Sequence, residues 1–249
     1  MPRTKALHRY EQRVKDYDTD IEMTELLVKV FLSMRNDNRS LSEAMGGGTS
    51  YKILSKRTNT LNSRRIVGYH LRNTVYTSFI KDLFEDFSEY LATTLAKASL
   101  TNIDAARFTG ESKIDLKASE ILSAGSWENV TQLVSDKIFR SIENEKSTQK
   151  LIEKVDGKLG LDLDTNILEN AMPYLDTRHI LVHRDGKADA EFIQKYPQIS
   201  LDTHGYIKIN KTLITEAKKY VSQLAVHIDS KIIAAGFARA QDIAGAINQ

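Results

Sequence analysis

Apolar residues recur every three or four positions along most of this chain, which places them on one side of an α-helix. The clearest stripe has Phe79, Leu83, Phe87, Leu91 and Leu95 at intervals of four. The first predicted helix contains Val14, Tyr17, Ile21, Leu26, Leu27, Val30 and Phe31 at roughly helical spacing. The pattern predicts helices over residues 7–34, 60–98 (one long or two stacked), from about 113, 127–144, 166–172, 173–186 and 212–237.

The segments between these helices carry turn-forming residues. Residues 35–40 break the first helical pattern, and a triple glycine follows at 46–48. The glycines lack the downstream Gly-Lys-Ser/Thr of a phosphate-binding loop, so we interpret them as a hinge. The nearby Lys52, Lys56, Arg57, Arg64 and Arg65 are expected to form a solvated basic face.

The pattern predicts an all-α fold with two parts. Residues 1–50 form an N-terminal helical arm and glycine hinge, and residues 51–249 form the main helical domain. A loop is expected at 101–112, and a short irregular or hairpin insert at about 200–210 precedes the last helix. The only tryptophan, Trp127, is expected in the core, and the chain end after residue 237 is expected to fray.

Composition narrows the class of protein. Hydrophobic residues make up 41% and charged residues 27%, which is typical of a globular chain. The formal net charge of +2 argues against general coating of polyanions, and the absence of cysteine excludes disulfides and thiolate metal sites. The N-terminus lacks an apolar signal core, and no run approaches the roughly 20 apolar residues of a membrane span. We therefore expect a cytoplasmic protein without a membrane partner.

The densest cluster of chemical groups lies at residues 173–186. Arg178, His179, His183 and Arg184 surround a short apolar run there. Pro173 suits the first position of a helix because its missing N–H has no partner there, and Gly186 suits the left-handed cap after the last turn. Asp164 or Thr165 can cap the preceding short helix at 166–172.

This segment resembles a known motif. The sequence Arg178-His179-Ile180-Leu181-Val182-His183, followed by Asp185-Gly186, is similar to the Arg-x4–6-His motif of the HEPN superfamily (higher eukaryotes and prokaryotes nucleotide-binding). The flanking pattern is similar too, with long apolar helices before the motif and one final helix after it. The resemblance is closest to stand-alone domains of the RiboL-PSP type and covers roughly residues 72–231.

The resemblance implies a HEPN-like helical bundle that pairs as a homodimer, with the two motifs facing each other across a cleft. It implies a metal-independent endoribonuclease without a cofactor, acting on RNA as a toxin or antiphage defence effector with a possible antitoxin or defence partner. Arg178 and His183 match the catalytic positions. Many members have Asn where this chain has His179, which puts the usual role of that position in doubt.

The chemistry also follows from the residue types. A neutral imidazole can take the proton of an RNA 2′-OH, an imidazolium can protonate the leaving 5′ oxygen, and a guanidinium can stabilise the charge on the phosphate. On a regular helix Arg178 and His183 lie about 140° apart, so a site shared by two chains fits better than a site within one. His179 and Arg184 are expected to bind substrate or support the second proton transfer.

Two other interpretations stay open. His179 and His183 are four residues apart and can ligate zinc if Asp176, Asp185 or Glu89 supplies a third ligand, although the Glu of a hydrolytic zinc helix is absent. Alternatively, Arg178 and His183 are structural, and the chain is a catalytically silent nucleic-acid-binding or protein-interaction module.

Overall fold

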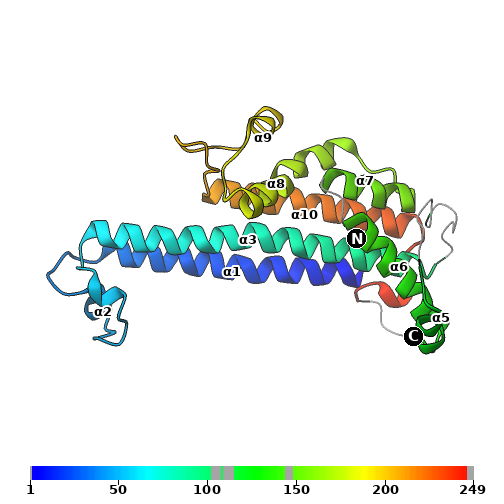
Figure 1. Cartoon of the computed structure of the whole chain (residues 1–249), viewed down its shortest axis with the longest axis horizontal. Coiled ribbons are helices and arrows are strands. Elements are labelled where there is room, and N and C mark those ends of the chain that lie inside the picture. Colours follow the sequence, from blue (N-terminus) through cyan, green and yellow to red (C-terminus); the bar gives the residue numbers. More distant parts are fainter. Residues whose placement is uncertain (1, 102–107, 109–114, 144–147, 246–249) are drawn as a thin grey trace. The chain divides into compact units, whose positions relative to one another are not determined.

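The computed structural model describes residues 2–101, 108, 115–143 and 148–245. These residues form helices joined by turns and loops, with no β-strand among them, which confirms the all-α prediction (Figure 1). The helices are α1 (Lys5–Ser33), α2 (Leu41–Ala44), η1 (Leu54–Lys56), α3 (Leu61–Ala98), α5 (Ala118–Ser123), α6 (Trp127–Glu143), α7 (Thr148–Leu159), α8 (Thr165–His183), α9 (Ala190–Lys195), α10 (Lys211–Ala234) and η2 (Ala240–Asp242).

Most predicted segments correspond to one of these helices, and the segment predicted at 60–98 is a single helix, α3. Much of the loop predicted at 101–112 lies outside the described residues. So do the predicted helix boundaries at 113 and 144 and the last four residues. No described helix combines the length and the apolar character that crossing a membrane requires.

The chain divides into two compact units. One, which we call the bundle unit, consists of Met1–Val14 and Ile80–Gln249; the other, the hairpin unit, is Lys15–Phe79. Helices α1 and α3 each contribute residues to both units. The hairpin unit is therefore one continuous stretch of sequence inserted within the bundle unit.

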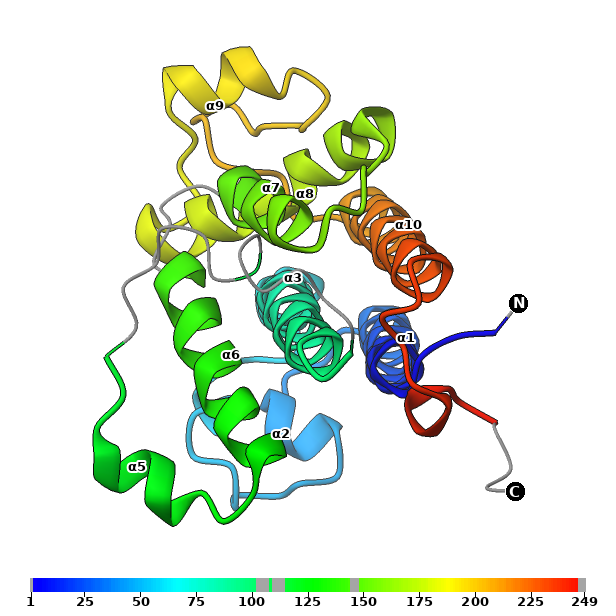
Figure 2. The same cartoon turned by 90° about the vertical axis from the view of Figure 1, so that its right-hand side faces the viewer.

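In the bundle unit, α10 contacts both the start of α1 and the last part of α3 (Figure 2). The Thr4 backbone N–H and hydroxyl donate to the buried Asp229 carboxylate at 2.9 and 2.5 Å. The Tyr90 hydroxyl of α3 donates to the Ala225 carbonyl at 3.1 Å. Because these groups are buried, their hydrogen bonds offset the cost of removing them from water. Helix α8 also packs along α10, where the Tyr174 and Tyr220 rings stack at 5.6 Å.

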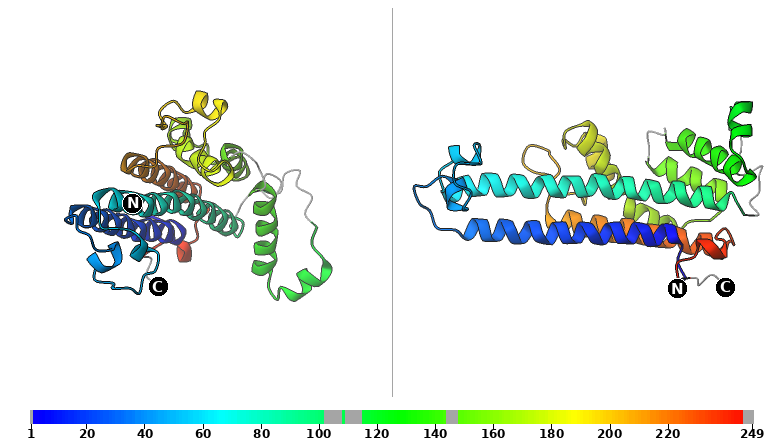
Figure 3. Two further views of the ribbon diagram at one scale, coloured as in Figure 1. Left: turned by 60° about the vertical axis from the view of Figure 1, so that its left-hand side comes forward. Right: turned by 90° about the horizontal axis from the view of Figure 1, so that it is seen from below.

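In the hairpin unit, α1 and α3 run antiparallel, side by side (Figure 3). Buried Val28 and Phe31 of α1 meet α3 at Gly68, where a Cβ would lie 3.4 Å from both side chains. Tyr17 packs edge-on against Phe79 with ring centroids 5.7 Å apart. A glycine at position 68 thus lets the two backbones approach closely.

The loop at the end of the hairpin is organised by a buried arginine. Arg64 is only 1% exposed and donates to the Asn59 side chain, to the Asn36 side chain at 3.0 Å and to the Met34 carbonyl. The prediction that Arg64 belongs to a solvated basic face is therefore wrong. Burial of its guanidinium is offset because loop oxygens, which sequence spacing does not reveal, accept from both of its Nη atoms.

Helix α8 differs from its prediction. The break expected at Pro173 is wrong, since α8 begins after the Asp164 cap and continues through Pro173 to His183. Pro173 is buried, and the continuous apolar side of the helix includes Leu168, Met172 and Leu175. The burial of this side offsets the roughly 3 kcal/mol cost of an internal proline. The predicted cap is confirmed, because Gly186 has φ +84° and its N–H donates to the Ile180 carbonyl at 3.1 Å.

One further expectation is corrected in the bundle unit. Trp127 is 80% exposed, so its predicted core position is wrong; it is the first residue of α6, where the helix has just left the loop.

The insert before α10, predicted to be irregular or a hairpin, contains no strand. It has isolated antiparallel bridges from Lys187 to Tyr206 and from Leu201 to Ile207. The Asp202 carboxylate accepts from the backbone N–H of His204 and Tyr206, which closes a turn instead of a strand pair.

Candidate functional site

The last turns of α8 present two adjacent imidazoles. His179 and His183 are four residues apart, so they lie one above the other on the same side of the helix. Their ring centroids are 4.7 Å apart, with the rings tilted by 48°, and both side chains are exposed. Neither ring is buried in the core, so both are accessible to a substrate.

Arg184, directly after the helix, is held by the start of α9. Its guanidinium forms an ion pair with the Asp189 carboxylate at 2.7 Å. The same Asp189 caps α9 by accepting from the Phe192 backbone N–H at 2.8 Å. The cap thus fixes the carboxylate, and the carboxylate in turn orients the guanidinium.

A cleft of about 230 Å³ lies between the His179 side of α8 and α9. Within it, Asp176 accepts hydrogen bonds from the Tyr196 hydroxyl and from Lys195, the latter at 3.5 Å. Burial, together with the hydrogen bond to Asp176, raises the pKa of the Tyr196 phenol, which keeps it a proton donor. The cleft is lined by Thr148, Asp176, His179, Ile180, Arg184, Asp189, Glu191, Phe192, Lys195 and Tyr196.

The sequence pattern does not predict α9 or the residues with which it lines this cleft. Residues 187–205 lack a long apolar period, so no element was predicted there. The Asp189 cap followed by Glu191 is a helix-start signal that could have indicated α9. Nothing in the local sequence indicates that Tyr196 would meet Asp176, twenty positions earlier.

Arg178 lies in a different cleft from His179. Its guanidinium carbon is 4.8 Å from the centre of the Phe84 ring, and its Nη2 is 3.9 Å from a Glu85 carboxylate oxygen. Its Nε is buried without a hydrogen-bond partner. This cleft, of about 600 Å³, is lined by Phe84, Glu85, Ser88, Glu89, Ala92, Asp136, Arg140 and Arg178. His183 lines neither cleft, so one chain does not bring Arg178 and the imidazoles together in a single cavity.

Among the described residues, no third metal ligand lies beside the histidine pair. Throughout the described ranges, no three His, Asp or Glu side chains gather closely enough to hold a metal ion. Asp176 is engaged by Tyr196 and Lys195, and Glu89 forms an ion pair with Arg13.

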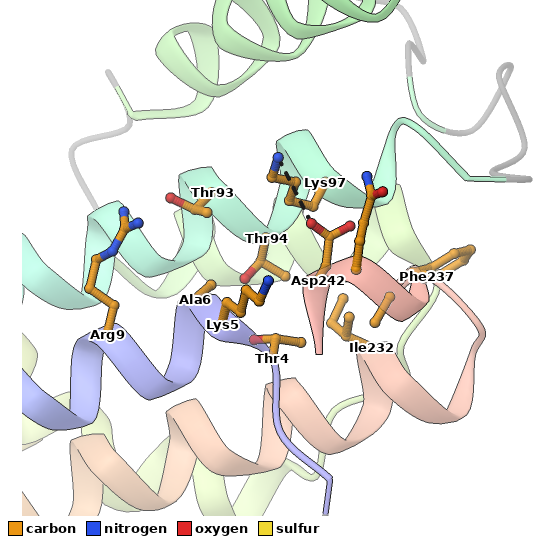
Figure 4. A pocket seen from close by; sticks show the side chains of 12 residues that line it. Thr4, Lys5, Ala6, Arg9, Thr93, Thr94, Lys97, Ile232, Phe237 and Asp242 are labelled. Atoms are coloured by element: carbon orange, nitrogen blue, oxygen red, sulfur yellow. Dashed lines mark ion pairs between the residues drawn. The ribbon is translucent and has the colours of Figure 1, made fainter. Parts of the chain in front are cut away.

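A separate cavity of about 350 Å³ lies where α1 begins, between α1, α3 and the chain after α10 (Figure 4). Lys5, Arg9 and Lys97 are at its border, and Lys97 pairs with Asp242 at 3.9 Å. Asp242 also pairs with Arg239 at 2.8 Å. No sequence motif points to this cavity, and its carboxylate, Asp242, is engaged by Lys97 and Arg239, so the cavity is not the best candidate for catalysis.

Comparison of this chain with protein-family models, with curated proteins and with solved structures finds no match.

Proposed function

We propose that this protein is a metal-independent endoribonuclease that acts as a homodimer through the end of α8. The observation that carries the proposal is the exposed pair of imidazoles, His179 and His183, with ring centroids 4.7 Å apart. The similarity of residues 178–183 to the HEPN motif supports the same activity. A toxin or antiphage effector, held in check by an antitoxin or another defence protein, is the context we propose.

Two neighbouring imidazoles can perform both proton transfers of RNA cleavage. In the proposed reaction, neutral His183 takes the proton of the 2′-OH as that oxygen attacks the adjacent phosphorus. The bond from phosphorus to the 5′ oxygen breaks, and protonated His179 gives its proton to this leaving oxygen. The products are a 2′,3′-cyclic phosphate and a free 5′-OH, and no metal or cofactor takes part.

The two arginines have different proposed roles. Arg184, fixed by Asp189, binds the phosphate of the RNA next to the imidazoles of its own chain. Arg178 faces a different cleft from His179, so we propose that it serves the imidazoles of the other chain. There its guanidinium stabilises the negative charge that grows on the phosphate oxygens. Its single, long contact with Glu85 leaves donors available for this task.

A catalytically silent protein-interaction module is the second candidate. It is favoured by the carboxylates in both clefts, which repel a phosphate backbone: Asp176, Asp189 and Glu191 in one, and Glu85, Glu89 and Asp136 in the other. In this alternative the arginines form ion pairs with those acids and the imidazoles have no catalytic role.

The first test is cleavage of total RNA by the purified full-length chain in the presence of EDTA. His179→Ala and His183→Ala are each expected to reduce the rate by about 100-fold or more, because each removes a proton-transfer group. His204→Ala, which removes an exposed imidazole from the insert, is the matched control and keeps full activity. Intact RNA with the wild-type chain, or equal rates for all three variants, would favour the interaction module.

Mixing two inactive variants tests whether the site is shared. If Arg178 of one chain serves the imidazoles of the other, a mixture of Arg178→Ala and His183→Ala chains contains heterodimers with one complete site. Such a mixture is expected to recover part of the wild-type activity, while each variant alone stays inactive. Without recovery, Arg178 and His183 act within one chain or Arg178 is not catalytic.

A further inference from the structure

The hairpin unit carries a second apolar stripe on α1 that faces water. Met23, Leu26, Leu27 and Val30 are 54, 56, 53 and 56% exposed. They follow the i, i+3, i+4, i+7 spacing that puts four side chains along one side of a helix. Exposed leucines scattered singly are ordinary, but a continuous stripe of this kind marks a surface that binds something.

The stripe lies on a different side of α1 from the residues that pack against α3. At 100° per residue, its centre is about 120° from the centre of the side formed by Thr24, Val28 and Phe31. The same geometry places Val67 and Leu71 of α3 on the side of the hairpin where Leu27 lies. We call Met23, Leu27, Val30, Val67 and Leu71 the apolar face, with Leu26 at its edge.

The opposite side of the hairpin carries charged groups beside the exposed ring of Tyr69, so it is less uniformly apolar than the apolar face. There Glu25 accepts from the Tyr76 hydroxyl at 2.5 Å and pairs with Arg72 at 3.8 Å. Ile66, 51% exposed, projects from α3 away from the apolar face. The two sides of the hairpin thus differ in how apolar their exposed side chains are. The same difference is expected of two helices taken alone from a four-helix bundle.

Charge also varies along the hairpin. Residues 15–22 of α1, which precede the apolar stripe, contain four acidic side chains and one basic side chain. Residues 35–60, in the loop that follows it, contain five basic and two acidic side chains. The apolar face therefore lies between an acidic end and a basic end.

We propose that the apolar face is a homodimerisation surface on which the hairpin of a second copy packs to form a four-helix bundle. A two-fold axis near Leu27 brings Met23 of one copy opposite Val30 of the other, so a single surface is complementary to itself. With α1 antiparallel to its counterpart, the acidic end of each copy lies over the basic end of the other. A parallel arrangement, with the connecting loops of both copies at the same end, would place like charges together. The charge distribution therefore favours the antiparallel arrangement.

The first experiment measures the mass of the full-length chain by sedimentation across micromolar concentrations. The wild type is expected to sediment with twice the mass of Leu27→Glu, because a buried carboxylate without a partner opposes association through the apolar face. The ratio is four chains to two if the ends of α8 also pair, and two chains to one if they do not. Ile66→Glu places the same charge on the other side of the hairpin and keeps the wild-type mass. Circular dichroism verifies that both variants stay helical. A monomeric wild type, or a Leu27→Glu variant with the mass of the wild type, would overturn the proposal.

Disulfide cross-linking tests the orientation, and the absence of native cysteine makes it unambiguous. In the antiparallel arrangement Met23 of one copy lies opposite Val30 of the other. A mixture of Met23→Cys and Val30→Cys chains therefore brings two cysteines together, with Cα atoms within the roughly 7 Å that a disulfide requires. Oxidation is expected to give a covalent dimer with the mixture and little with either variant alone. A covalent dimer of Met23→Cys alone would indicate a parallel pair and refute the antiparallel arrangement. Neither experiment depends on RNA cleavage, so the dimer surface and the proposed nuclease can fail separately.

Discussion

A single histidine in the bundle unit links two helices and makes their contact sensitive to pH. The Nε2 atom of His227, on α10, accepts the backbone N–H of Asp164 at 3.1 Å. Asp164 is the residue that caps α8. Burial, followed by the nearby Lys231, lowers the pKa of His227 from its ordinary value of 6.5, so the folded chain favours the neutral ring that can accept this hydrogen bond.

The lowered pKa sets the direction of a pH effect on stability. His227 contributes fully above its unfolded pKa of about 6.5, and the contribution is lost as the pH falls through the lower folded value. Thermal unfolding of the wild type is therefore expected at lower temperature at about pH 5 than at about pH 7.5. His227→Gln keeps an acceptor but cannot titrate, so its melting temperature should fall less. Equal decreases in both proteins would exclude His227 as the cause.

Residue-level roles were the hardest to predict from the sequence. Arg178, His179, His183 and Arg184 were identified by their types and spacing, yet their division between two sides of α8 required the positions of α9 and α3. Burial of Arg64 escaped prediction because its partners are oxygens of a loop whose conformation spacing does not encode. His227 was given no role, since its partner lies 63 positions away.

At the scale of an element, the end of α8 depends on backbone conformation. Asp185 and Gly186 have φ values of +51° and +84°, in the left-handed region. Gly186 both donates to the Ile180 carbonyl and accepts the Ile207 N–H at 2.9 Å, so one residue ends the helix and receives the insert. The orientation of the segment that follows His183 is thereby fixed.

Two glycine-to-alanine changes are expected to have opposite effects on stability. Gly186→Ala should lower the free energy of unfolding by about 1 kcal/mol, because an L side chain is strained at this φ. The strain comes from the backbone and not from crowding, since the added Cβ would make an ordinary 3.6 Å contact with Leu181. Gly157→Ala, in the interior of α7 with open space around it, should stabilise by about 0.5 kcal/mol. Urea denaturation of both variants checks the signs. A Gly186→Ala protein as stable as the wild type would contradict the strained cap.

Helices were predicted better than their ends. The Asp164 cap and the Gly186 cap follow local rules, and both are confirmed. Pro173 misled the prediction because proline breaks a helix only where packing does not hold it; here Leu168, Met172 and Leu175 are buried on both sides of it. Local signals thus gave the outer limits of α8 but not its continuity.

At the scale of the whole molecule, the sequence pattern combined two stripes of α1 into one. Ile21 and Phe31 belong to the buried side, whereas Leu26, Leu27 and Val30 are exposed. Counting apolar residues at helical spacing cannot separate these sets, because both keep the same period. The width of the combined stripe was the available signal, since a helix in a simple pair needs only one apolar side.

Pairing through the apolar face links stability to protein concentration. If two copies associate only when folded, mass action raises the melting temperature as the concentration rises. The wild type is expected to melt several degrees higher after a hundredfold concentration increase, whereas the melting temperature of Leu27→Glu should rise less over the same range. Differential scanning calorimetry over this range provides the measurement. A melting temperature of the wild type that does not change with concentration would indicate that folding and pairing are independent.

The hairpin unit enters and leaves the bundle unit through helix, at Val14–Lys15 on α1 and at Phe79–Ile80 on α3. Matched insertions or deletions of whole turns in both helices would change the length of the hairpin unit while each remaining side chain kept its angular position. Variants of different hairpin length can therefore keep the same contacts between α1 and α3. Unmatched changes would shift one helix against the other and separate Gly68 from the two side chains that fill the space beside it.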